Sequence, residues 1–246
     1  KMKSKNVVVI TMVIPKDRKL DKFGGWEWMS YTKKAWEYWC EKNNCELVIY
    51  DTPSIEDTTK FRITVQRWFD VFNFVPKWDC TNFFDLTNGK FTISVEQDNL
   101  AWIYESIEGY KDFFNGYELD ISKYFNSGFI IFNKSHKYIF DKFKEIYTDR
   151  LDEILKIQNT LKRGTCQTPL NYIVQMEDVD VEWLPIPFRL SHLPRKDLLQ
   201  HNWQDGDDKT PFFIKYGYVW VFSGFDKTVR NRLMKETWDL VGKNYE

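Results

Sequence analysis

Apolar runs and amphipathic stretches alternate along the first fifty residues of the chain. Asn6–Ile14 is almost wholly apolar and stops at Pro15, which predicts a strand buried on both faces. Ser30–Cys40 places its apolar residues on one helical face, and Glu46–Tyr50 is again typical of a strand. A strand, a helix and a strand of these lengths predict a βαβ unit, and therefore a parallel pair of strands.

The same alternation continues through the middle of the chain. Apolar residues recur at helical spacing in Asp57–Phe72 and in Asn99–Tyr110. Between these two predicted helices, Asn88-Gly89 predicts a turn. Two short apolar runs, Phe129–Phe132 and Val179–Leu184, predict further strands, the first of them buried on both faces.

Lys134–Ile157 predicts one long amphipathic helix. Apolar side chains keep their helical spacing along the whole stretch, and Ser135 is placed to cap the first turn. The segment that follows, Gly164–Asn171, is interpreted as a loop.

From Ser191 onward the chain becomes polar and loop-like. Phe212–Phe222 still predicts a strand, and Lys227–Lys243 predicts a closing amphipathic helix. No stretch has the composition of a linker between domains. We therefore expect one α/β domain with a mostly parallel central sheet flanked by helices, in which residues 1–190 form the core and residues 191–246 a C-terminal flap.

Composition excludes several classes of partner. The 246 residues include 35 basic and 36 acidic side chains, and a formal net charge of −1 argues against nucleic acid or an anionic membrane surface as the main partner. No apolar run is long enough to cross a bilayer. The four cysteines match no metal-binding spacing, which favours a reduced, cytoplasmic compartment.

Small polar residues stand directly before the strand predicted at Phe129–Phe132. Asn126 and Ser127 offer hydrogen-bonding groups, and Gly128 allows the backbone to approach a ligand closely. A turn that simply enters a core strand is the alternative interpretation. Aromatic residues make up 18% of the chain, which suits stacking on bases or sugar rings, although large core residues explain most of them.

Several segments together resemble a GT-A-fold glycosyltransferase, close to the family-8-like enzymes found in phages, algal viruses and marine bacteria. The segments occur in the order that this family has, and they are spread over most of the chain. They are Val7–Val13, Lys60–Phe69, Asp79–Thr87, Tyr124–Asn133, Gly164–Asn171 and Val221–Lys227. The resemblance implies a GT-A-like, Rossmann-like fold and the transfer of a sugar from a nucleotide-sugar donor to a glycan or another hydroxyl acceptor.

The resemblance also implies roles for individual residues. Donor binding is expected of Asn126, Ser127, Gly128, Asp51, Arg62, Gly224 and Lys227. Gln167 would face the sugar at the reaction centre, and Asp98 is the carboxylate expected near the acceptor, which His192 would also contact. Each role has a structural alternative: a turn cap, a residue at a helix start, a solvated lysine or a loop histidine.

The expected metal site departs from the family pattern at three places. The family holds a divalent cation, Mn²⁺ or Mg²⁺, with an Asp-x-Asp pair, but Asp70–Asp79 contains none. Val221 stands where the family has a histidine ligand, and Cys166-Gln167 stands for its Asp-Gln. Asp79 is the nearest possible substitute ligand, so a cofactor metal is expected only if the site is unconventional.

Three explanations account for these departures. The first is a metal-independent transferase in which cationic side chains stabilise the leaving diphosphate, the candidates being Lys60, Arg62, Arg67 and Lys227. The second is a catalytically degenerate protein that binds a nucleotide or glycan or has a structural role. The third is a chain that lacks a segment before Asp79. A nucleotidyltransferase is a weaker alternative, because it too needs paired acids for its metal.

Overall fold

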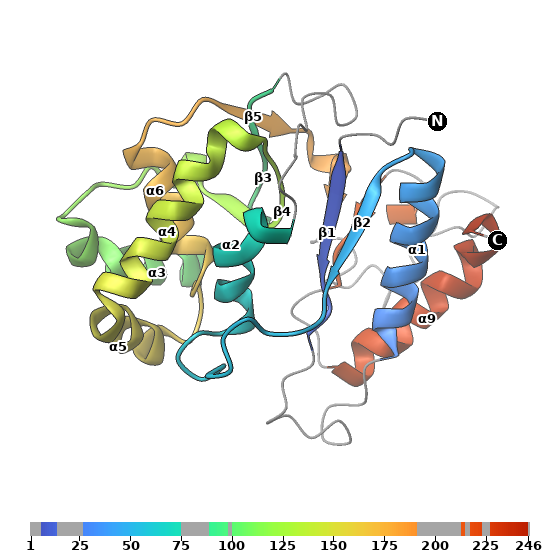
Figure 1. Ribbon diagram of the computed structural model, residues 1–246, viewed down its shortest axis with the longest axis horizontal. Helices are drawn as coiled ribbons and strands as arrows, with labels where there is room; N and C mark the ends of the chain where they lie inside the picture. Colours follow the sequence, from blue (N-terminus) through green and yellow to red (C-terminus); the bar gives the residue numbers. More distant parts are fainter. Residues whose placement is uncertain are drawn as a thin grey trace.

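Short strands in three small sheets form the framework of the computed structural model, which describes residues 6–13, 27–74, 89–97, 100–190, 213–214, 217–222 and 227–245. Helices surround these sheets in a mixed α/β arrangement that forms a single domain (Figure 1). Within the described residues, no helix is both long and apolar enough to span a membrane.

The first sheet confirms the predicted βαβ unit. β1 (Val7–Thr11) and β2 (Glu46–Tyr50) pair in parallel, and α1 (Trp28–Lys42) connects them. Alternate side chains of β1 contribute to two different hydrophobic clusters, because Val7 and Val9 pack against one and Val8 and Ile10 belong to the other. Both faces of this strand are therefore covered by apolar side chains, as its sequence predicts.

The second sheet has β3 (Phe91–Val95) at its centre. β3 pairs in parallel with β5 (Val181–Leu184) and antiparallel with β4 (Phe125–Ile131). The helices that pack around this sheet and one another are α2 (Ile63–Phe74), α3 (Leu100–Lys111), α4 (Lys137–Asp149), α5 (Leu151–Leu161) and α6 (Gln167–Met176).

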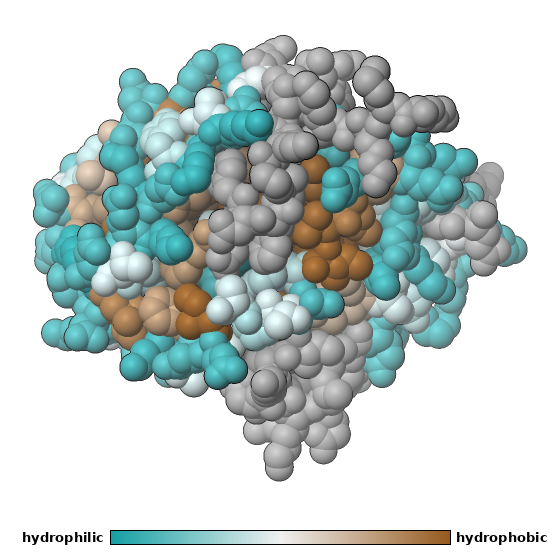
Figure 2. Space-filling view, viewed as in Figure 1, coloured by the Kyte–Doolittle hydropathy of each residue, from teal (hydrophilic) through white to brown (hydrophobic). Residues whose placement is uncertain are grey.

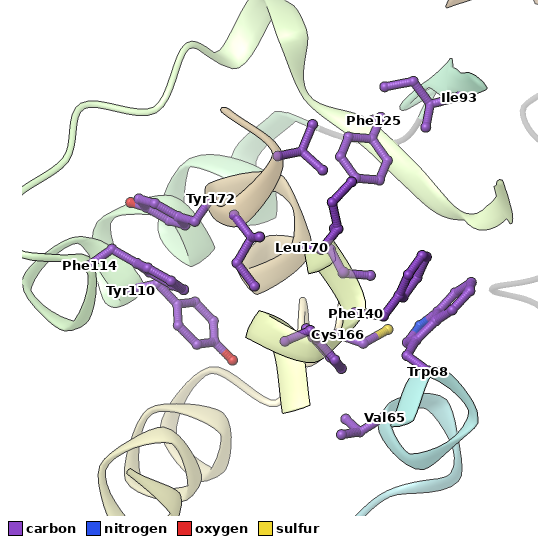
Figure 3. Packing of buried hydrophobic residues seen from close by; sticks show 14 of the residues in the cluster. Val65, Trp68, Ile93, Tyr110, Phe114, Phe125, Phe140, Cys166, Leu170 and Tyr172 are labelled. Atoms are coloured by element: carbon purple, nitrogen blue, oxygen red, sulfur yellow. The ribbon is translucent and has the colours of Figure 1, made fainter. Parts of the chain in front are cut away.

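The main hydrophobic core lies between this sheet and these helices. Figure 3 shows Phe125 of β4, Leu170 of α6 and Phe140 of α4 in one layer of buried side chains. Aromatic rings fill much of it, since Trp68 stacks on Phe140 with ring centroids 5.5 Å apart. Such large buried side chains dominate the stabilisation of a core.

The chain closes with a small third sheet and a C-terminal helix. β6 (Arg189–Leu190) pairs in parallel with β7 (Val219–Trp220). α9 (Lys227–Val241) packs against α1, where Trp238 stacks on Tyr31 at 5.7 Å. The remaining described elements are 3₁₀ turns: Asp112–Phe114, Ile121–Lys123, Lys134–His136, Ile186–Phe188 and Gly242–Tyr245.

Two predictions about strands need correction. Among the described residues the strands form three sheets instead of one central sheet, and β4 runs antiparallel to its neighbour. Among the described residues of the strand predicted at Phe212–Phe222, only Val219–Trp220 is a strand, and residues 213–214 are helical. An apolar run of this kind does not distinguish a strand from a buried helical segment, which is why the pattern misled here.

The single helix predicted at Lys134–Ile157 is also wrong. α4 ends at Asp149, and α5 begins at Leu151, because Arg150 has φ −130° and ψ 39°. The Arg150 guanidinium donates to the carbonyl of Phe113 at 2.7 Å and lies 3.8 Å from the centroid of its ring. A contact from a distant segment therefore accompanies the break, while the local apolar spacing continues across it.

The cap predicted at Ser135 is wrong, because the side-chain cap lies on the 3₁₀ turn Lys134–His136 that leads into α4. Asn133 is the capping residue, and its side chain accepts a hydrogen bond from the backbone N–H of Ser135 at 2.9 Å. His136 Nδ1 accepts from the backbone N–H of Asn133 at 3.1 Å, which completes a reciprocal capping box.

Two further helix starts differ from their predictions. α2 begins at Ile63, six residues later than predicted, because the Asp57 carboxylate accepts hydrogen bonds from the backbone of Thr59 and Lys60 and forms a turn first. Gly164–Asn171 is not a loop throughout, since α6 begins at Gln167.

Candidate functional site

An irregularity in β4 marks the candidate site. Ile93 of β3 pairs with Ile130, but the next residue, Ser94, pairs with Asn126, so residues 127–129 have no partner on β3. The segment predicted as a turn before the strand thus lies inside β4 as a bulge, which corrects that prediction. Bulges re-aim side chains and occur often beside active sites.

Side chains of α6 hold the bulged strand in place. Asn171 accepts a hydrogen bond from the N–H of Phe125 at 2.8 Å and donates to the carbonyl of the same residue at 2.9 Å. Gln167, one turn earlier, accepts from the N–H of Ser127 at 3.1 Å. These helix side chains replace a neighbouring strand, and polar residues can therefore occupy a buried part of β4.

A carboxylate lies at the centre of this arrangement. Glu96 directly follows β3, and its Oε2 accepts hydrogen bonds from Asn126 Nδ2 at 2.6 Å and from Gln167 Nε2 at 2.7 Å. Its Oε1 accepts from the N–H of Gln97 at 2.8 Å. The carbonyl oxygens of the two amides accept backbone N–H groups, so the network fixes which end of each amide faces Glu96.

Gly128 is the exposed tip of the bulge. Its N–H donates to Asn126 Oδ1 at 2.7 Å, and a Cβ atom at this position would lie only 2.7 Å from that oxygen. The glycine thus permits a close approach, as predicted, but the group that approaches it here is the Asn126 side chain. The same Cβ would lie 3.3 Å from Arg189 Nη2, which places a guanidinium beside the bulge.

Two cationic side chains border the bulge. Arg189 of β6 is only 1% exposed, and its carbonyl accepts a hydrogen bond from Gln97 Nε2 at 2.7 Å. Arg67 of α2 donates to the carbonyl of Ser127 at 3.4 Å, and its guanidinium lies 4.7 Å from the centroid of the Trp68 ring. Positive charge beside a carboxylate and two amides suits a polar, partly anionic ligand.

Buried hydroxyl groups lie next to the Glu96 network and hydrogen-bond to one another. Tyr124 and Thr168 share a hydrogen bond of 2.7 Å, and Thr168 and Ser106 share another of 2.6 Å. Burial raises the pKa of Tyr124 far above its usual value, so this phenol stays protonated. Gly164, at φ +65°, allows this packing, because a Cβ there would overlap the hydroxyl oxygens of Ser106 and Thr168.

The structure brings together four of the residues that the sequence singled out. Asn126, Ser127, Gly128 and Gln167 all belong to the network around Glu96. Four others, Asp98, Asp79, His192 and Gly224, lie outside the described residues. Lys227 begins α9, but its side chain is likewise outside the described part of the structure.

The remaining candidates lie elsewhere. Asp51 follows β2 in the other sheet, where it is exposed and accepts a hydrogen bond from Thr52 Oγ1 at 3.0 Å, as a turn aspartate does. Arg62 precedes α2 and lies close enough to Tyr110 and Tyr147 to oppose the burial that raises the pKa of both phenols. Lys60 is exposed and 3.9 Å from Asp57.

Glu96 is the residue that sequence reasoning missed. In the stretch Glu96-Gln97-Asp98 the resemblance predicts a role for Asp98, although Glu96 is the first residue after the buried run Phe91–Val95. A carboxylate directly after a buried strand is a usable signal, because ligand-binding groups often follow strand ends. Arg189 gave no such signal, because its proximity to Gly128 arises only in the folded chain.

The described residues do not fit a divalent cation. Such an ion needs several oxygen ligands, whereas both Glu96 oxygens already accept hydrogen bonds from N–H groups. In the part of the chain that the structure describes, no three His, Cys, Asp or Glu side chains gather in a way that could hold a metal. Asp79, the substitute ligand suggested by the sequence, lies outside that part.

Comparison with known proteins adds no relative to this picture. The sequence matches no protein-family model, and no curated protein matches it. The fold matches no solved structure either. What this site can do must therefore be inferred from its own residues and their geometry.

Proposed function

We propose that this protein is a glycosyltransferase with a GT-A-like fold, which moves a sugar from a nucleotide-sugar donor to a hydroxyl acceptor. One observation carries the proposal: Asn126, Ser127, Gly128 and Gln167, which come from segments about forty residues apart, converge on Glu96 at the end of the central strand β3. The resemblance implies that the same four residues lie around the donor sugar.

The chemistry of the cluster suits a sugar. Glu96 accepts hydrogen bonds, while Asn126 and Gln167 both donate and accept, which is the mixture that sugar hydroxyls require. All three side chains are positioned by hydrogen bonds to one another or to the backbone, so little reorganisation is needed when a ligand replaces one of these contacts.

Arg67 supplies the charge that the reaction demands. When the bond between the anomeric carbon and the donor phosphate breaks, the leaving diphosphate gains negative charge. A guanidinium beside Ser127 stabilises that charge in the role that a divalent cation has in related enzymes. Gly224 and Lys227 remain the further residues expected at the diphosphate, and Asp98 and His192 remain those expected near the acceptor.

The first test measures donor binding and turnover. Thermal unfolding is followed with a panel of nucleoside-diphosphate sugars, with and without Mn²⁺, and nucleotide release is measured in the presence of mixed hydroxyl acceptors. We expect one donor to raise the Tm, equally with EDTA and with Mn²⁺, and to release nucleotide. A rise that requires Mn²⁺ would instead indicate a metal site built with residues outside the described part, such as Asp79.

A matched pair of variants links turnover to the cluster. Glu96→Gln keeps the shape of the side chain but removes its charge, and we expect kcat/KM to fall about 100-fold. Glu105→Gln makes the same change at an exposed position of α3 and should leave kcat/KM within about twofold. Donor binding without nucleotide release in the parent protein would identify a degenerate, binding-only protein. No Tm shift with any donor would overturn the proposal.

A further inference from the structure

A cavity of about 420 Å³ lies between the two larger sheets. β1 and β4 form two of its walls, and residues of α1, α2, α9 and the β7 segment complete it. Figure 2 shows that hydrophobic residues gather near the middle of one face of the molecule, over β1 and β2. The volume falls within the range of about 300–1,000 Å³ that is usual for small-molecule sites.

Apolar side chains form most of the cavity wall, and the charges in it have one sign. Valine, isoleucine and tryptophan side chains dominate the lining, which also includes Arg67 and Arg230. No aspartate or glutamate is among the described residues that line it. A ligand that satisfies both features has an apolar body and a negative charge.

Each arginine is held against a tryptophan of the same cavity. The Arg67 guanidinium lies 4.7 Å from the Trp68 ring centroid, and that of Arg230 lies 5.4 Å from the Trp28 ring centroid. For Arg67, the anchor proposed below, stacking on an aromatic ring restricts the side chain in advance, so less side-chain entropy is lost when it binds an anion.

Two donors at the Arg67 corner lack acceptors among the residues that the structure describes. Within that part of the chain, Arg67 Nε and Trp68 Nε1 are both buried without a hydrogen-bond partner, and Arg67 forms no ion pair. An unsatisfied buried donor costs free energy that an incoming acceptor would recover. Because the Arg67 guanidinium lies over the Trp68 ring, one anionic group that enters this corner can serve both donors after a small rotation of the side chains.

We propose that this cavity binds a small amphipathic organic anion, with its phosphate or carboxylate group at Arg67 and its aromatic or aliphatic body between β1 and β4. A nucleotide fits less well, because its ribose hydroxyls need polar partners where these strands present valine and isoleucine side chains. Arg67 and Gly128 border both this cavity and the proposed donor site, so the inference adds a second ligand that approaches Arg67 from the side of β1.

The test compares two probes on the parent protein by calorimetric titration. We expect 1-naphthyl phosphate to bind at least tenfold more tightly than neutral 1-naphthol. Equal affinity for 1-naphthol would show an apolar cavity without anion recognition and would overturn the proposal. No binding of 1-naphthyl phosphate would overturn it as well.

Variants then locate the binding site. Arg67→Met should weaken the affinity for 1-naphthyl phosphate at least tenfold, and Thr32→Phe, which fills the cavity from α1, should weaken it similarly. Arg232→Met removes an exposed arginine of α9 that lies 3.8 Å from Glu236, and it should leave the affinity within twofold. Thermal unfolding of each variant confirms that it is folded. Unchanged affinity in both cavity variants would contradict the assignment.

Discussion

The sheet β4–β3–β5 and the sheet β1–β2 lie side by side but are packed to different degrees (Figure 1). Phe91, Phe125 and Leu170, around the first sheet, are fully buried in the main core. Val8 and Ile10 of β1 retain 8% exposure in a much smaller cluster, and the cavity borders them. A densely packed region thus adjoins a loosely packed one.

The comparison explains where the candidate site lies. The Glu96 network is built on the densely packed sheet, which can hold hydrogen-bonding groups in fixed positions. Its neighbour across Gly128 is the loosely packed side, which leaves room for a ligand. One region supplies rigid positioning and the other supplies space, and four measurements test this difference between them.

The largest effect is expected from opening a hole in the dense core. Leu170→Ala should lower the free energy of unfolding by about 2–5 kcal/mol, because the side chain is fully buried and its neighbours cannot collapse into the space. Met234→Ala, at the cavity wall on α9, should cost about 1 kcal/mol or less. Urea unfolding of both variants measures the difference, and equal costs would remove the contrast between the regions.

The next largest effect concerns the attachment of β4 to α6. Asn171→Leu keeps the branch at Cγ but leaves the N–H and carbonyl of Phe125 without their partner, so we expect a loss of about 2 kcal/mol or more. The amide proton of Phe125 should also exchange faster in hydrogen-exchange NMR. Asn159→Leu, at an exposed position of α5, is the matched control and should change the stability by less than about 0.5 kcal/mol.

A smaller effect is expected where α9 meets α1. Trp238→Ala removes the stack on Tyr31, and its cost should be about 1 kcal/mol. Because this seam belongs to the loosely packed region, the amides of α9 should exchange faster through local opening, while those of α6 keep their protection. Faster exchange in both helices would mean that the two regions unfold as one unit.

The smallest expected effect is a dependence of the stability on pH that arises from His136, at the start of α4. Burial lowers the pKa of His136, and its neutral Nδ1 accepts the hydrogen bond of the capping box. As the pH falls, His136 therefore takes up a proton near pH 6.5 in the unfolded chain, and only at a lower pH in the folded chain. The contribution of this group to stability is complete above that pH and declines as the pH falls toward the lower pKa of the folded state.

Urea midpoints measured between pH 7.5 and 5 test the role of His136. His136→Gln retains an acceptor for the N–H of Asn133 but cannot take up the proton. Its stability should therefore fall less steeply with acid than that of the parent protein. Parallel curves for the two proteins would assign the pH dependence to other groups.

Much of the local structure was predictable from the sequence. β2 occupies the predicted range, Glu46–Tyr50, and the helix and strand before it were expected in the right order. Asn126, Ser127 and Gln167 lie together in the structure, and the donor-site roles that the resemblance implies for them stay predictions. The end of β3 was harder, because Glu96 and Asp98 both follow it and nothing local distinguishes their roles.

The features that were predicted wrongly depend on contacts between residues that are distant in the sequence. The bulge in β4 exists because Asn171 and Gln167 satisfy its backbone, and α4 is separated from α5 where Arg150 reaches Phe113. The spacing of apolar residues along the sequence indicates only which faces of an element are buried. It was therefore enough to predict whether most elements are helices or strands, and to predict the order of the βαβ unit. Which side chains complete a strand, break a helix or surround Glu96 was decided by tertiary structure, because those hydrogen bonds join residues that only folding brings together.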